Sequence, residues 1–151
     1  MSTRSNIIVD DSYRRIQLYR HYDGFPDDLL PDLEQALLYA WPWPRFEAAD
    51  FAAAIVRAWK GEGGGNITVD GSPKDWELIH ADVEWVYLIR PQGEKMKEGV
   101  QPFYAGDPIV EVYDWRDFWF SGVDPHKVKP QPIKRVKLLE AKMAGRKDGG
   151  L

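Results

Sequence analysis

The chain has 151 residues, no cysteine and a formal net charge of −4. This length suits a single domain with a core of its own, and the lack of cysteine excludes disulfides, thiol nucleophiles and thiolate metal sites. The charge is unevenly divided: residues 127–151 hold eight basic and two acidic side chains, and residues 1–126 hold twelve basic and twenty-two acidic ones. Because an acidic body repels phosphate, we expect contact with nucleic acid only through the basic segment.

No stretch of the sequence approaches the roughly 20 consecutive apolar residues that a membrane-spanning helix needs. The first residues, MSTRSNIIVDD, lack the apolar run of a signal peptide. The absence of cysteine fits a reducing compartment. We therefore expect a soluble, cytoplasmic protein with no membrane partner.

Residues 5–10 (SNIIVD) and 15–22 (RIQLYRHY) are typical of two strands joined by a tight turn. A register that pairs apolar with apolar side chains sets Ile7 opposite Leu18 and continues to Val9 opposite Ile16. Asn6 then faces Tyr19, and Arg4 faces His21. The N-terminus is thus predicted to be a β-hairpin.

Apolar side chains at helical spacing predict a helix from about residue 27 to residue 41, with an aspartate as its cap, and a second helix over about 47–60. Strands are expected over 66–71, 82–91 and 108–115, and an amphipathic helix over 134–145. Helices placed between runs of strands indicate an α+β fold: an antiparallel sheet with an N-terminal hairpin, two helices packed on one face and a C-terminal helix. We assign residues 1–126 to this single domain and residues 127–151 to a basic extended or helical tail.

The hairpin register suggests a polar group made of Arg4, His21 and Asp23, with Tyr19 on the same face of the sheet. The aspartate would fix the histidine tautomer and the arginine would hold a phosphate or carboxylate. In the alternative interpretation, Asp23 begins an Asp-Gly turn through its own backbone contacts, and Arg4 pairs with it to secure the N-terminus. The sequence leaves both interpretations open.

Other catalytic patterns are missing. His21, His80 and His126 lack metal-ligand spacing, and there is no G-x-S-x-G motif. The glycines at 61–65 follow a predicted helix and precede a strand, which is the wrong order for a phosphate cradle. We therefore assign no catalytic residue, metal or cofactor, and an enzyme is the less favoured class.

Aromatic side chains are dense over residues 113–120 (YDWRDFWF). Trp115 and Trp119 either pack in the core or serve as anchors for a protein partner, because aromatic residues flanked by acids suit a basic partner surface. Both interpretations remain open.

Residues 2–7 (STRSNI) and 18–26 (LYRHYDGFP) resemble a family of short uncharacterised proteins found mostly in phages and phage-rich genomic regions. The shared patterns are Thr-Arg-Ser-x-Ile and Tyr-x-His-x-Asp-Gly-x-Pro, and Phe25 stands where an aromatic residue, often tyrosine, is usual. A later stretch, 82–89 (DVEWVYLI), resembles the acidic-aromatic strand of such proteins. The resemblance implies an origin and a hairpin but no catalytic residues.

Three functions are consistent with these features. The first is a phage-type accessory protein of the host cytoplasm that binds and modulates or inhibits a host protein, one that is basic or handles nucleic acid. An anti-defence role such as anti-CRISPR inhibition is one form of it. The second is a small-ligand or nucleotide-binding protein, or a small hydrolase, that uses Arg4, His21 and Asp23. The third is a phage structural or assembly factor.

Overall fold

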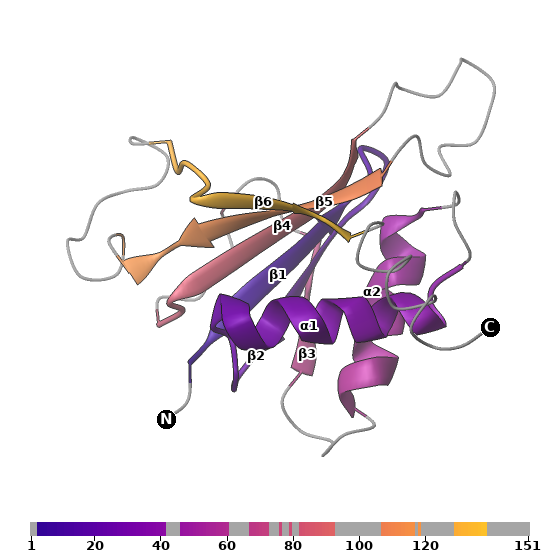
Figure 1. Cartoon of the computed structure of the whole chain (residues 1–151), viewed down its shortest axis with the longest axis horizontal. Coiled ribbons are helices and arrows are strands. Elements are labelled where there is room, and N and C mark those ends of the chain that lie inside the picture. The colour runs from indigo at the N-terminus through magenta and orange to yellow at the C-terminus, as the bar shows by residue number, and fades with distance from the viewer. Residues whose placement is uncertain are drawn as a thin grey trace.

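The computed structural model describes residues 3–41, 46–60, 67–72, 76, 79, 82–92, 107–116, 118 and 129–138. Its centre is a six-stranded sheet in the order β3-β2-β1-β4-β5-β6, and the helices cover one face of it (Figure 1). The elements are β1 (Ser5–Asp10), β2 (Arg15–Arg20), α1 (Pro26–Ala36), the short 3-10 helix η1 (Leu37–Tyr39), α2 (Ala48–Lys60), β3 (Ile67–Gly71), β4 (Trp85–Gln92), β5 (Asp107–Asp114) and β6 (Lys134–Lys137). The expected α+β class is confirmed.

The N-terminal hairpin has the predicted register. Ile7 lies opposite Leu18 and Asn6 lies opposite Tyr19. The pairing holds because a slip of one residue would turn the apolar side chains of both strands away from the helices. β2 ends at Arg20, however, so the hairpin stops before His21.

The expected antiparallel sheet is wrong at one pair of strands, because β1 and β4 run parallel, with Ser5 opposite Trp85 and Val9 opposite Ile89. β3 joins the free edge of β2, whereas β4 lies on the other side of β1. β3 and β4, which follow each other in sequence, are therefore not neighbours in the sheet. The sheet is mixed, and β1 and β4 begin at the same end of it.

The helix predicted over 134–145 is also not found as expected. Residues 134–137 form β6 instead, with Val136 opposite Val110 of β5, and residues 139–145 lie outside the described part of the chain. Leu138 is buried in the core on the helix side of the sheet. A segment that the sequence analysis placed in a basic tail thus supplies an edge strand.

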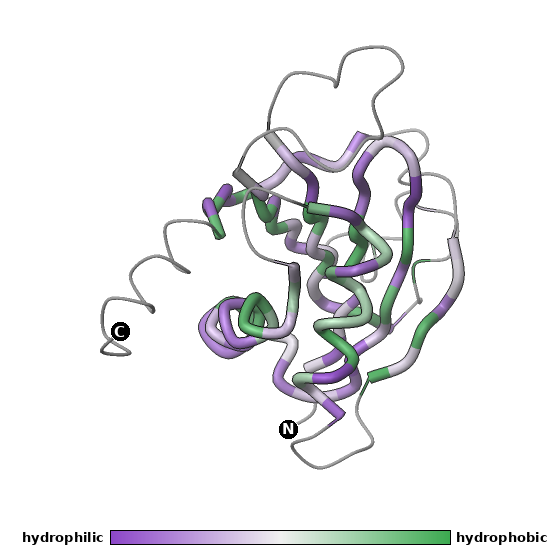
Figure 2. The backbone as a smooth tube through the Cα atoms, turned by 90° about the vertical axis from the view of Figure 1, so that its right-hand side faces the viewer, coloured by the Kyte–Doolittle hydropathy of each residue, from purple (hydrophilic) through white to green (hydrophobic). Residues whose placement is uncertain are grey.

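Apolar side chains pack on both faces of the sheet. Figure 2 marks the hydrophobic residues of the strands and helices in green along the backbone. On the helix side, Ile7, Leu18 and Tyr87 pack against α1 and α2. The opposite face carries a smaller cluster, and its buried members are Ile8, Val83, Val86, Leu88, Tyr113 and Trp115. None of the helices in the described ranges is long and apolar enough to cross a bilayer.

Two polar side chains tie the helices to the sheet. The Asp11 carboxylate accepts hydrogen bonds from the backbone N–H groups of Tyr13 (2.8 Å) and Arg14 (2.6 Å), and from Ala48 (2.8 Å) at the start of α2. Arg20 forms an ion pair with Asp32 of α1, and its guanidinium carbon lies 4.3 Å from the centre of the Trp59 ring of α2. These contacts fix both helices relative to the hairpin.

Candidate functional site

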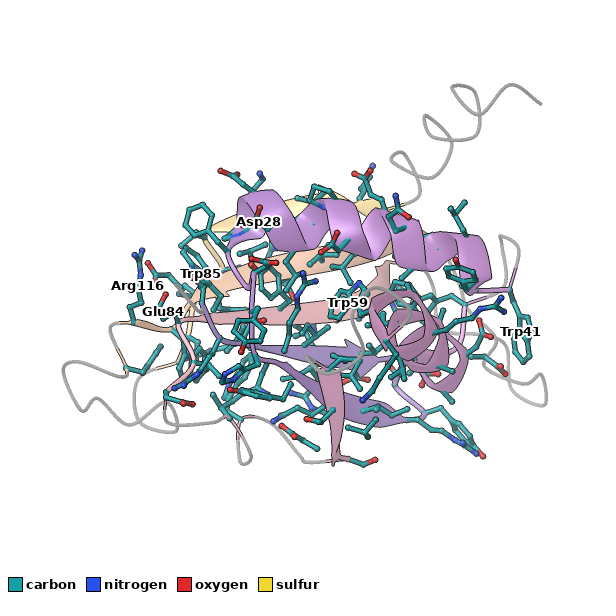
Figure 3. All side chains as sticks on the ribbon, turned by 90° about the horizontal axis from the view of Figure 1, so that it is seen from below. Asp28, Trp41, Trp59, Glu84, Trp85 and Arg116 are labelled. Atoms are coloured by element: carbon teal, nitrogen blue, oxygen red, sulfur yellow. The ribbon has the colours of Figure 1, made fainter. Side chains whose placement is uncertain are left out.

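The sequence-predicted site residues that the structure describes, which are all except Trp119, lie at one end of the sheet, where β1 and β4 begin and β2 and β5 end. The backbone N–H of Glu84 donates to the Arg4 carbonyl (3.0 Å), and that of Trp115 donates to the Glu84 carbonyl (2.8 Å). In Figure 3, Asp28, Glu84, Trp85 and Arg116 gather here, far from Trp41. We call this part of the molecule the aromatic end, and its residues are Arg4, His21, Tyr22, Phe25, Glu84, Trp85 and Arg116.

A tight turn between β2 and α1 forms part of the aromatic end. Asp23 has a φ of 54°, in the left-handed region that Asp tolerates better than most residues. The Gly24 N–H donates to the Thr3 carbonyl (2.9 Å), and a Cβ on Gly24 would lie only 2.7 Å from that same oxygen. Pro26 then begins α1 with its fixed φ. Turn and helix-start chemistry thus accounts for the Asp-Gly-x-Pro pattern.

Arg4 does not form the expected group with His21 and Asp23. Its guanidinium is paired with Asp82, and within the described residues no hydrogen bond or ion pair joins it to His21 or Asp23. The hairpin ladder ends at the Ser5–Arg20 pair, and the left-handed Asp23 then turns the chain. Sequence reasoning missed Asp82 because it reaches Arg4 only through the parallel pairing of β1 and β4.

His21 contacts Tyr19 instead. The Tyr19 hydroxyl lies 3.0 Å from His21 Nδ1, within hydrogen-bond distance. Burial raises the pKa of Tyr19, and the Asp82 carboxylate raises it further while Arg4 opposes the shift. Among described residues, His21 Nε2 has no hydrogen-bond partner.

The aromatic rings of this end are stacked edge to face. Phe25 meets Trp85 at a centroid distance of 5.5 Å and an interplanar angle of 90°, and Tyr22 meets His21 at 4.6 Å and 84°. Trp85 is buried, but Tyr22 remains 51% exposed and Phe25 42% exposed. Two large rings are therefore fixed in place with much of their surface in water.

The charged groups around these rings are mainly acidic. Arg116 lies 4.9 Å from the centre of the Trp85 ring, but its charge is compensated by Asp114, whose pKa is lowered by hydrogen bonds from Arg116. Four further carboxylates form no ion pair within the described residues. They are Asp23, Asp27, Asp28 and Glu84, and we call them the acidic rim.

Trp115 lies beside this end but is only 4% exposed. Its ring packs against Trp76 at 5.2 Å and against Phe118 at 4.6 Å between centroids. Of the two interpretations of Trp115, core packing is the one that its burial supports. Trp119 lies outside the described residues.

A buried polar network on the same face was not predicted. Asn6 Nδ2 (3.1 Å) and Gln17 Nε2 (3.3 Å) both donate to one oxygen of Asp70. This network joins β1, β2 and β3 across the sheet. Within the described ranges, no group of three or more metal-ligating side chains is present.

Comparison of the chain with protein-family models, curated proteins and solved structures found no match. The function is therefore inferred from the residues and contacts themselves.

Proposed function

We propose that this chain is a non-catalytic binding protein that docks on another protein through its aromatic end and thereby modulates or inhibits it. The observation that carries the proposal is the partial exposure of Tyr22 (51%) and Phe25 (42%), each held edge to face on a neighbouring ring. Large aromatic side chains dominate binding energy at protein interfaces. A ring that is already fixed loses little entropy when a partner covers it.

The charge of this end indicates a basic partner. The acidic rim lies at the same end of the molecule as the exposed rings, and the arginines Arg4 and Arg116 are already paired with Asp82 and Asp114. Complementary charge speeds association and disfavours the wrong partners. A host protein that handles nucleic acid has a basic surface of the kind that fits such a rim.

The resemblance of residues 2–7 and 18–26 to phage-associated proteins supports a phage-type accessory role in the cytoplasm of a host cell. Inhibition of a host defence complex, including a CRISPR-type complex, is one form of this role. It is supported by that resemblance and by the acidic character of the aromatic end.

A second candidate rests on the Tyr19–His21 contact. The open Nε2 of His21 could bind a small anionic ligand such as a nucleotide. It is less favoured because Arg4, the expected phosphate-binding group, is paired with Asp82.

The test is capture of partners from host lysate on the immobilised full chain, followed by titration of each recovered protein with purified variants. Tyr22→Ala combined with Phe25→Ala should weaken binding at least tenfold, the effect expected of an interface hot spot. Tyr13→Ala is the matched control, because Tyr13 is 69% exposed and lies in the turn at the other end of β1. It should bind as the wild type does.

Two outcomes would contradict the proposal. The first is that no protein is recovered, or that the recovered protein binds the double variant and the wild type equally. The second is that a small molecule is recovered and His21→Ala alone abolishes its binding, which would establish the ligand-binding alternative.

A further inference from the structure

The sheet edge formed by β6 has the opposite charge to the aromatic end. Residues 129–138 (KPQPIKRVKL) contain four basic side chains and no acidic one, and all four are exposed. On β6 itself, Arg135 and Lys137 point to the face away from the helices, because Leu138 packs in the helix-side core and Val136 lies opposite Val110, a member of that core. This edge is a strongly basic strip on an acidic protein.

Two arginines on this face are held by one buried carboxylate. Glu111 of β5 is only 3% exposed. Its Oε1 atom forms an ion pair with Arg90 of β4. Its Oε2 atom lies 3.0 Å from Nε of Arg135 of β6. The two arginine side chains are 53% and 66% exposed. Each arginine contacts Glu111 through one of its guanidinium nitrogens. The other N–H donors of the two guanidinium groups have no partner among the described residues and are accessible to solvent.

The two arginines held by Glu111 are more than is needed to protect the β6 edge from pairing with another chain. Lysines on an edge strand discourage pairing with other chains through charge alone. A buried carboxylate that holds two guanidinium groups also fixes the direction of their N–H donors. Guanidinium groups oriented in this way can donate paired hydrogen bonds to phosphate oxygens. The register also sets Arg135 and Lys137 about 6.7 Å apart along β6, so that their charges form a row.

We propose that this basic surface, made of Arg90, Arg135 and Lys137, binds the phosphate backbone of a nucleic acid. The contacts are to phosphate only and carry no base specificity. The surface lies on different residues from the aromatic end, so the proposal does not depend on the proposed protein partner. A chain that binds a protein at one end and nucleic acid at the β6 edge would act where both are present together.

The experiment measures fluorescence anisotropy of labelled single-stranded and duplex DNA with the full chain, over a range of salt concentrations. Arg135→Gln combined with Lys137→Gln should weaken binding by on the order of tenfold or more. It should also reduce the slope of log K against log salt by about 2, or about 1 for each basic side chain that no longer neutralises a phosphate. Arg135→Lys keeps the positive charge but removes the planar guanidinium group that can donate two hydrogen bonds to one phosphate. It should therefore weaken binding with a nearly unchanged salt slope.

Two variants serve as controls. Arg116→Gln removes an exposed arginine at the aromatic end and should leave DNA binding unchanged. The Tyr22→Ala and Phe25→Ala variant should also bind DNA normally, which separates this proposal from the protein-binding one. Urea unfolding of each variant verifies that the fold is intact.

The proposal is overturned if the wild type does not bind DNA at low salt, or if the Arg135→Gln and Lys137→Gln variant binds with the wild-type affinity and slope. It is also overturned if polyglutamate displaces DNA as well as an oligonucleotide of equal charge does. That last result would assign the basic surface to an acidic protein segment.

Discussion

The Tyr87 hydroxyl donates a 2.6 Å hydrogen bond to the carbonyl oxygen of Gly24. Through this bond, the central strand β4 holds the turn that carries Tyr22 and Phe25, although the two residues are 63 positions apart. The Gly24 N–H is held by Thr3 at the same time. The orientation of the exposed rings therefore depends on a buried tyrosine that no partner would touch.

Tyr87→Phe should lower the free energy of unfolding by about 2 kcal/mol. The ring remains in place, but the buried Gly24 carbonyl loses its donor, and an unsatisfied buried acceptor costs about 1–3 kcal/mol. The measurement is urea unfolding, with the midpoint shifted and the m-value unchanged. Tyr13→Phe, at an exposed position, is the control and should change stability by less than about 0.5 kcal/mol. Equal stability of both variants would show that the Tyr87 hydrogen bond contributes nothing.

The stability of the wild type should fall as the pH rises above 10. Burial raises the pKa of Tyr87 well above the 10.0 of a free tyrosine, so the unfolded chain releases this proton near pH 10 while the folded chain retains it. The contribution is fully present below pH 10 and is lost above it, at up to about 1.4 kcal/mol per pH unit. Tyr87→Phe should show a shallower alkaline decline in urea midpoints. Parallel declines for the two proteins would contradict this assignment.

Substitutions of Asp23 distinguish a turn residue from a binding residue. Because Asp23 has a φ of 54°, Asp23→Gly should preserve stability, and Asp23→Ala should lose about 1 kcal/mol from left-handed backbone strain. Thermal unfolding measures both. If the carboxylate itself binds a ligand, as the sequence also allowed, Asp23→Gly would fold normally and lose that ligand.

Asp11→Ala should destabilise the protein by about 2–3 kcal/mol. The buried carboxylate satisfies three backbone N–H groups, and the one on Ala48 replaces a side-chain cap at the start of α2. Asp11→Asn keeps one acceptor oxygen and should lose less. Urea unfolding compares them with Glu34→Ala, an exposed site on α1, which should change little. A loss no larger than that of Glu34→Ala would exclude this bridging role.

Trp115→Ala should cost about 3–5 kcal/mol, the range for deletion of a large buried aromatic side chain. The ring is enclosed by Trp76 and Phe118, so the loss should appear as a lower melting temperature. Any loss of partner binding at low temperature, where the variant remains folded, should be small. A fully stable variant that no longer bound its partner would instead make Trp115 a contact residue.

Local patterns in the sequence were enough to predict the N-terminal hairpin, its register and the α+β class. The hairpin could be predicted because its strands are separated by one short turn, and apolar residues that must face the helices leave a single register. The span of α2 was predicted closely for a similar reason, since its apolar side chains repeat at helical spacing within one short segment.

Only the tertiary structure decided which residues meet at the aromatic end and on the basic surface. The parallel pairing of β1 with β4 brings Asp82 to Arg4, across 78 positions of sequence, so that Arg4 forms its ion pair with Asp82 and not with Asp23. The strand β6 arises where local spacing favoured a helix, because pairing with β5 and burial of Leu138 outweigh helix propensity. Contacts of this kind depend on the order of strands in the sheet, and no periodicity within a single segment reports that order.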